Sequence, residues 1–114
     1  MIIDAEINSG EMLNFLLKKE GFETEFAHTS EQFYKKINDF KPEMIILSDT
    51  KLNIVEMIQD NYVRNMDMPK CILITKNRFS EREQKILFKK FNIVDFINPD
   101  NIIDELTTNI QKYL

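Results

Sequence analysis

Short apolar runs alternate along the chain with longer stretches in which apolar residues recur every three or four positions. The apolar runs fall at 1–4, 23–27, 44–47, 71–74 and 93–97. The periodic stretches fall at 11–20, 29–40, 54–63, 81–90 and from 100 to the end. Short apolar runs are typical of buried strands, and a spacing of three and four is typical of helices that cover one face. The pattern therefore predicts five strands, each followed by a helix.

Residues that commonly start or stop helices stand at the ends of these periodic stretches. Thr29 and Ser80 precede the second and fourth stretches, where a hydroxyl can accept a hydrogen bond from a backbone N–H of the first turn. Gly21 follows the first stretch, and Pro42 follows the second. Glycine readily takes the left-handed conformation that ends a helix, and proline cannot continue one. We therefore expect Thr29 and Ser80 to be N-caps.

The periodicity also predicts which helix residues face the core. The fourth helix carries two adjacent aliphatic residues, and the last helix carries four at helical spacing. The predicted inward residues are Ile86 and Leu87 in the fourth helix and Ile102, Ile103, Leu106 and Ile110 in the last.

Regular alternation of strand and helix predicts a parallel sheet with helices on both faces, joined by right-handed crossovers. The chain has 114 residues, enough for one domain spanning 1–114. Apolar residues make up 43% of it, which is sufficient to form a core. The sequence thus predicts a single α/β domain.

Charge and cysteine content exclude several classes of partner and compartment. There are 15 basic against 19 acidic side chains, a net charge of -4, which argues against a nucleic-acid surface. No apolar stretch approaches the roughly 20 residues that span a bilayer, so we expect no membrane insertion. No signal peptide is recognisable. Cys71 is the single cysteine, which is consistent with a reducing, cytoplasmic environment.

Several short motifs, in their order and spacing, resemble the CheY-like receiver domains of response regulators, and this resemblance covers essentially the whole chain. The matching positions are Asp4, Ala5 and Glu6 after the first strand, Gly21 and Phe22 after the first helix, Lys41, Pro42 and Glu43 before the third strand, Thr75 after the fourth, and Asn98 and Pro99 after the fifth. The resemblance implies a doubly wound, flavodoxin-like fold: a five-stranded parallel sheet of order 2-1-3-4-5 with five helices.

The resemblance also implies a phosphorylation site at the carboxyl ends of the strands. In such domains two acidic residues and an acceptor aspartate hold Mg²⁺, while a lysine and a Thr or Ser contact the phosphoryl group. In this chain Ala5, Ser48 and Asn98 stand at the positions of the second acid, the acceptor and the lysine. Only Asp4 and Thr75 match the pattern. We therefore predict no aspartyl phosphorylation, no catalytic residue, no bound metal and no cofactor.

Asp49 directly follows Ser48 and is the one residue that could act as a shifted acceptor. Side chains alternate faces along a strand, so a slip of one residue turns the carboxylate away from the site. The gapless spacing from Asp4 favours Ser48 at the acceptor position.

Other residues of interest have both a local structural interpretation and a family-based one. Thr75 is expected to satisfy neighbouring backbone groups, and Asp4 to accept hydrogen bonds from backbone N–H groups. Cys71 is expected to be an inert core thiol. The resemblance implies a cis peptide at Asn98–Pro99, a geometry accessible only before proline. Phe96 is either the counterpart of the family's switch aromatic or an ordinary residue that packs in the core.

These features favour a signalling module of a two-component system that acts by phosphorylation-independent protein interaction, and not an enzyme. By resemblance, a protein partner or a second copy would bind the face formed by the fourth helix, fifth strand and fifth helix. The predicted residues of this face are Arg82, Lys85, Lys89, Phe96, Asn101, Asp104 and Glu105.

Two alternatives remain open at this point. One is a conventional phosphorylatable receiver that uses Asp49. The other is the regulatory domain of a transcriptional regulator whose DNA-binding half lies outside this sequence. A flavodoxin-like enzyme is disfavoured because the sequence has no glycine-rich phosphate loop and no metal-ligand spacing.

Overall fold

The computed structural model describes residues 1–4, 6–48 and 69–114. Five parallel strands form one sheet in the order β2-β1-β3-β4-β5. These strands are β1 (Ile2–Asp4), β2 (Phe26–Ala27), β3 (Met44–Ser48), β4 (Lys70–Ile74) and β5 (Ile93–Ile97). The predicted parallel sheet and its strand order are confirmed.

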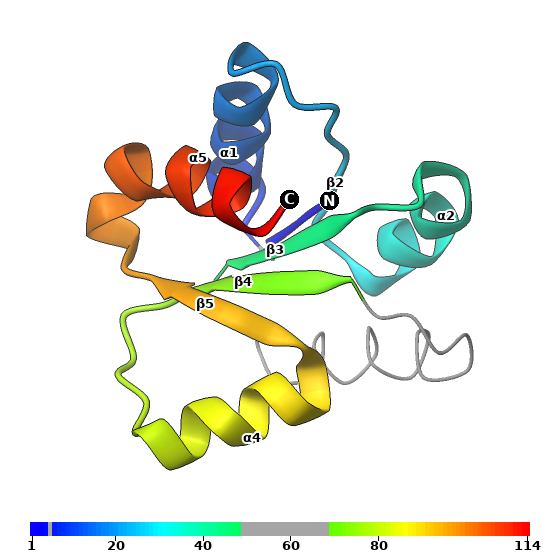
Figure 1. The fold of residues 1–114 in the computed structure, drawn as a ribbon. Helices are drawn as coiled ribbons and strands as arrows, with labels where there is room; N and C mark the ends of the chain where they lie inside the picture. Colours follow the sequence, from blue (N-terminus) through cyan, green and yellow to red (C-terminus); the bar gives the residue numbers. More distant parts are fainter. Residues whose placement is uncertain (5, 49–68) are drawn as a thin grey trace.

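Four α-helices and one short 3-10 turn are present within the described residues (Figure 1). They are α1 (Ile7–Lys19), α2 (Ser30–Phe40), α4 (Glu81–Phe91), η1 (Pro99–Asn101) and α5 (Ile102–Tyr113). The helix predicted at 54–63 lies outside the described residues. Four of the five predicted helices are thus confirmed.

Helices cover both faces of the sheet, α1 and α5 on one side and α2 and α4 on the other (Figure 1). Along β3 the side chains alternate between two buried clusters, so Ile45 packs towards α2 and α4 while Ile46 packs towards α1 and α5. This alternation follows from the two-residue repeat of a strand. Burial on both faces explains why β3 and β4 consist almost entirely of apolar residues.

The predicted helix caps are confirmed by their hydrogen bonds. Thr29 Oγ1 accepts from the Gln32 N–H at 3.2 Å. Ser80 Oγ accepts from the Glu83 N–H at 3.2 Å, and Glu83 Oε1 accepts from the Ser80 N–H at 3.1 Å, which forms a capping box. These bonds satisfy backbone N–H groups that the first turn of a helix leaves without intrahelical partners.

Some helix limits differ from the predicted ones. Helix α1 begins at Ile7, about one turn before the predicted start at 11. Strand β2 contains two residues where the apolar run predicted 23–27. The last helix does not begin at Asp100, because η1 precedes α5. These differences lie at element ends, where sequence patterns are least informative.

Two of the predicted inward residues point outward, and both predictions are wrong. Ile86 is 48% exposed and Ile103 is 77% exposed. In α4 the residues that face the core are Leu87 and Phe91, which are one turn apart. Ile86 lies about 100° around the helix from Leu87 and therefore faces solvent. In α5 the inward ridge is Ile102–Leu106–Ile110, at a spacing of four, and Ile103 lies about 100° around the helix from Ile102.

Strand β5 is an edge of the sheet and carries an irregularity in its pairing with β4. Two of its backbone groups bond to side chains of the same domain. The Phe96 N–H donates to Asp95 Oδ1 at 2.8 Å, and the Val94 carbonyl accepts from the Tyr113 hydroxyl at 3.3 Å. Helix α5 is therefore tied to the edge strand.

Among the described helices, none has the length and apolar character needed to cross a bilayer.

Candidate functional site

The carboxyl ends of the strands bring the predicted site positions to one edge of the sheet. Asp4 ends β1 and Ser48 ends β3, and the two residues are direct partners in the β1–β3 ladder. Thr75 follows β4, and its N–H donates to the Ile97 carbonyl of β5 at 2.9 Å. Asn98 follows β5. Two further predicted positions, Ala5 and Asp49, lie outside the described residues.

Asp4 carries a carboxylate at this edge, and it is buried, with 3% of its surface exposed. Its Oδ1 accepts a hydrogen bond from the Glu6 N–H at 2.9 Å, as the sequence predicted. Its Oδ2 is buried and has no hydrogen-bond partner among the described residues. A buried polar oxygen of this kind is normally satisfied. Asp4 can therefore still accept a donor or a cation at Oδ2.

Ser48 and Thr75 are buried hydroxyl residues; Ser48 lies beside Asp4 in the sheet, and Thr75 directly follows β4, the next strand. Thr75 Oγ1 accepts from the Asn77 N–H at 3.1 Å and so fixes the turn after β4. The prediction that Thr75 satisfies local backbone groups is confirmed. A hydroxyl used in this way stabilises the loop whether or not a ligand is present.

Asn98 caps the turn that follows it. Its Oδ1 accepts from the Asp100 N–H at 2.9 Å, and Pro99 occupies the first position of η1. No cis peptide occurs in the described ranges, so the predicted cis bond before Pro99 is wrong. The trans form is the intrinsically preferred one, and a proline at N1 suits helical geometry without isomerisation. The side chain at this position is a neutral, exposed amide engaged in its own turn.

The described residues do not form a magnesium site by themselves. Mg²⁺ prefers oxygen ligands in near-octahedral geometry. Asp4 contributes one free carboxylate oxygen, and within the described ranges no group of three or more His, Cys, Asp or Glu side chains is placed to hold a metal ion. The donor set on this edge therefore falls short of the one that the family resemblance implies.

Cys71 lies in β4, fully buried in the cluster towards α2 and α4. Burial raises the pKa of its thiol to about 12. The thiolate, which is the reactive form, is therefore strongly disfavoured. The structure supports the prediction that Cys71 is a core thiol.

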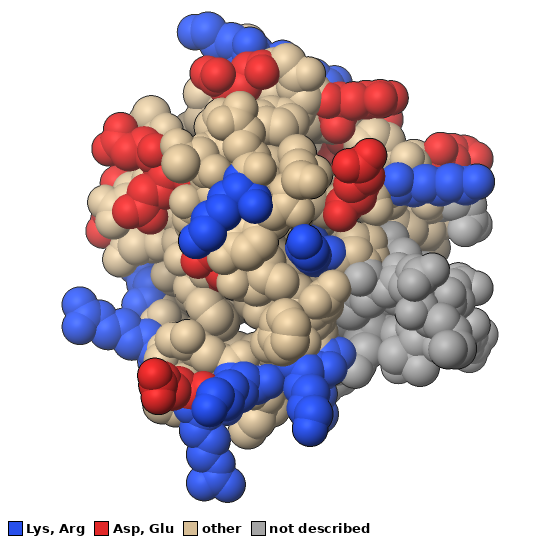
Figure 2. Space-filling model, in the orientation of Figure 1, with Lys and Arg blue, Asp and Glu red and all other residues tan. Residues whose placement is uncertain are grey.

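The residues predicted for the interaction face lie in two oppositely charged groups. Arg82, Lys85 and Lys89 are exposed on α4, while Asn101, Asp104 and Glu105 are exposed on η1 and the first turn of α5. Figure 2 shows Lys and Arg gathered over α4 and Asp and Glu gathered over the start of α5. This segregation gives one side of the domain a basic and an acidic half.

A groove of about 660 Å³ runs between α4 and β5 within this face. Phe88 and Phe96 contribute apolar surface, and Lys85 and Asp95 contribute charge. Phe96 is half-buried, with its ring 5.3 Å from that of Phe79, so core packing accounts for its position. Phe88 is 55% exposed and did not belong to the predicted face. Phe88 directly follows the inward residue Leu87, and this position was the sequence signal that could have placed its side chain at the surface.

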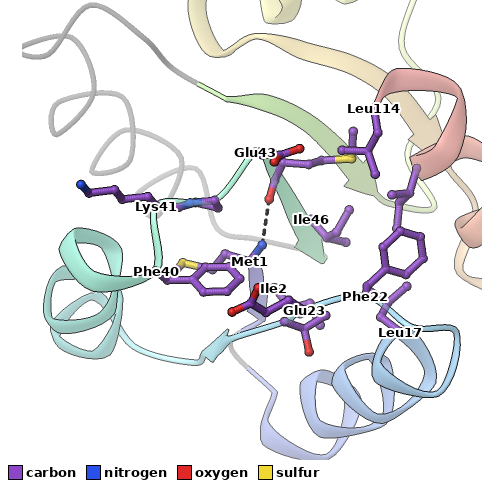
Figure 3. A pocket seen from close by; sticks show the side chains of 14 residues that line it. Met1, Ile2, Leu17, Phe22, Glu23, Phe40, Lys41, Glu43, Ile46 and Leu114 are labelled. Carbon is purple, nitrogen blue, oxygen red and sulfur yellow. Dashed lines mark hydrogen bonds between the residues drawn. The ribbon is translucent and has the colours of Figure 1, made fainter.

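A second cavity lies far from the strand carboxyl ends, at the opposite edge of the sheet. It measures about 240 Å³, and Leu17, Phe22 and Phe40 are among its apolar lining residues (Figure 3). The Met1 amine lies in it and donates to the Met44 carbonyl at 2.8 Å. Burial lowers the pKa of this amine to about 5. No sequence pattern indicated this cavity.

The fold is that of the CheY-like receiver domains. The chain superposes on CheY4 of Vibrio cholerae with a TM-score of 0.81 and 16% identity, over 99% of this chain and 95% of that one. It superposes on TrrA of Thermotoga maritima, in complex with Mg²⁺–BeF, with a TM-score of 0.73 and 23% identity, over 99% and 96%. No protein-family model and no curated protein sequence matches the chain.

The same fold also occurs within longer proteins. The chain superposes on NtrX of Brucella abortus, in complex with ATP, with a TM-score of 0.75 and 19% identity. The match covers 99% of this chain but 26% of NtrX, so the chain spans about a quarter of that protein.

Proposed function

We propose that this chain is a receiver-type signalling module of a two-component system, which acts through protein interaction without aspartyl phosphorylation. The observation that carries the proposal is the pairing of Ser48 with Asp4 at the ends of β3 and β1. In the receiver fold this position after the third strand holds the acceptor aspartate. A serine hydroxyl becomes a nucleophile only when an adjacent base activates it.

The surroundings of Ser48 support the same conclusion. Asn98 offers no positive charge to offset a phosphoryl group, and its amide oxygen already accepts the Asp100 N–H. The Thr75 hydroxyl oxygen accepts from the Asn77 N–H; the hydroxyl can still donate its proton but carries no charge. Phosphoryl transfer depends on groups that stabilise the developing negative charge. The described residues provide few of them.

Loss of the acceptor changes how such a module can operate. A ligand shifts a conformational equilibrium only if it binds the two states with different affinity. Without phosphoryl binding, the domain signals through the surface that it presents constitutively. The face of α4, β5 and the start of α5 is the surface that we propose for a partner, because it combines an apolar groove with segregated charge.

The decisive experiment is a titration with beryllofluoride and Mg²⁺, followed by amide NMR shifts of the full chain. We expect no saturable response at Asp4, Ser48 or Thr75, and TrrA serves as the positive control because it is known in complex with Mg²⁺–BeF. A saturable Mg²⁺-dependent response would overturn the proposal. If Asp49→Ala then abolished that response, the chain would be a phosphorylatable receiver that uses Asp49.

A further variant tests the assignment of the acceptor position itself. Ser48→Asp restores a carboxylate opposite Asp4, and we expect it to gain weak Mg²⁺ binding that the unaltered chain lacks. Asp95→Asn serves as a matched control, because this carboxylate lies within β5 and bonds to its own strand. No gain in Ser48→Asp would contradict the placement of Ser48 at the acceptor position.

A further inference from the structure

Helix α1 exposes large apolar side chains on the face that points away from the sheet. Leu13 and Leu17 face the core and are buried. Phe15 lies between them in sequence and is 67% exposed, and Met12 is 48% exposed. Since successive residues turn by about 100°, Phe15 points to the side of the helix opposite Leu13 and Leu17. A phenylalanine at the centre of a solvent-facing helix surface requires an explanation beyond the core of this domain.

The charges around Phe15 are arranged symmetrically and with opposite sign. Glu11 lies one helical turn before Phe15, and Lys19 lies one turn after it, so all three form one ridge along the helix. Both charged residues are exposed. Neither forms an ion pair with another residue in the described ranges. Met12 and Lys18 likewise lie three positions before and after Phe15.

We infer that this ridge of α1, centred on Phe15, is a self-association surface that binds a second copy of the chain. In an isologous contact the same patch is used by both copies, related by a two-fold axis. In an antiparallel α1 pair, the two-fold axis passes beside Phe15. A residue that precedes Phe15 in one copy then lies opposite the residue that follows Phe15 by the same number of positions in the other copy. Glu11 of each copy then faces Lys19 of the other, and Met12 faces the aliphatic stem of Lys18.

The antiparallel arrangement is also the electrostatically favoured one. It brings the positive amino end of each helix beside the negative carboxyl end of the other. A parallel pair would instead place Glu11 near Glu11 and Lys19 near Lys19, which are repulsive contacts. The apolar centre excludes water, while the flanking charges fix the register.

This surface is separate from the face assigned to a partner under the proposed function. The ridge lies wholly on α1, whereas that face is formed by α4, β5 and the start of α5, so the two surfaces share no residue. Helices α1 and α5 cover the same side of the sheet and α4 covers the other (Figure 1). The inference therefore does not depend on whether the chain is phosphorylated. A single helix pair is small compared with the interface of a stable dimer, so the association is weak and depends on concentration.

The test is sedimentation velocity of the full chain over a concentration series reaching about 1 mM, a range suited to weak complexes. We expect the weight-average sedimentation coefficient to rise with concentration for the unaltered chain and to stay at the monomer value for Phe15→Asp. Ile103→Asp is the matched control, because Ile103 is even more exposed but lies on α5. Circular dichroism of each variant verifies that the fold is retained.

Charge reversal tests the geometry of the pair. Glu11→Lys and Lys19→Glu should each weaken association about tenfold, because each variant places like charges opposite each other twice. An equimolar mixture of the two variants should recover association as a heterodimer, since both cross-pairs are then complementary. The double variant Glu11→Lys/Lys19→Glu should recover it as well.

Three results would overturn the inference. The first is a chain that stays monomeric throughout the concentration series. The second is an equal loss of association in Phe15→Asp and Ile103→Asp. The third is a mixture of the two single-charge variants that associates no better than either variant alone.

Discussion

The close approach of α1 to strand β2 at Gly10 gives the sharpest stability prediction. Gly10 is buried within α1. A Cβ atom at this position would overlap the Phe26 ring at Cε1 and Cζ and would lie 2.9 Å from Cδ1. The Phe26 ring in turn lies 5.8 Å from the His28 ring, so a shift of the Phe26 ring towards His28 would disturb a second side chain. The perturbation is Gly10→Ala.

Two opposing contributions set the size of the effect. Alanine in place of glycine within a helix stabilises by about 1 kcal/mol. Overpacking a well-filled core costs about 1–3 kcal/mol. We therefore expect Gly10→Ala to lower the free energy of unfolding by about 1 kcal/mol, which corresponds to a fall in Tm of roughly 4 °C for a chain of this size.

The assay is thermal and urea unfolding followed by circular dichroism, which suits a chain without tryptophan. Phe26→Leu removes the ring atoms that a Cβ at Gly10 would meet, so Gly10→Ala in that background should be neutral or stabilising. Asn8→Ala, at an exposed site of the same helix, reports the effect of helix propensity without the clash. The reasoning is refuted if Gly10→Ala stabilises the otherwise unaltered chain, or if its effect is the same with and without the Phe26 ring.

Three other predictions concern single groups. Burial lowers the pKa of the Met1 amine from 8.0 to about 5, so the unfolded chain binds one more proton than the folded chain between these pH values. The free energy of unfolding should therefore fall by about 1 kcal/mol per pH unit as the pH drops from 8 to 5. Urea unfolding across this range should show the slope, and Nα-acetylation should abolish the part of the slope that the amine contributes. Because the pKa of Cys71 is raised to about 12, the folded chain should resist a thiol reagent at pH 8 and react fully once unfolded; rapid labelling of the folded chain would contradict this. Ser80→Ala should cost about 1 kcal/mol by removing the hydroxyl that accepts the Glu83 N–H, whereas Ser80→Asp should retain most of the stability; equal losses in urea unfolding would argue against the cap.

The sequence predicted the sheet well because its inner strands are buried on both faces. The runs 44–47 and 71–74 are continuously apolar, and β3 and β4 lie at these positions. The caps at Thr29 and Ser80 were predictable for a different reason, since their hydrogen bonds are local and span three residues. A few neighbouring residues are therefore enough to predict such a cap.

The predictions that were wrong depended on three-dimensional context. Ile86 and Ile103 each lie beside an inward residue, and a spacing pattern alone cannot fix the rotation of a helix to better than about one residue. The trans peptide before Pro99 follows from the turn that Asn98 caps, which a family resemblance could not indicate. The charge symmetry around Phe15 became apparent only when the structure placed this side chain on the outside of α1.

The bonds that Asp95 and Tyr113 make along β5 bear on the solubility of the folded protein. An exposed edge strand can serve as a template on which strands of other molecules add, the first step towards fibrous aggregates. Here the Phe96 N–H and the Val94 carbonyl are already bonded within the domain, and the strand is irregular where it pairs with β4. This end of the sheet is thereby protected against intermolecular strand addition, so a molecule that docks at β5 must recognise side chains and not extend the sheet.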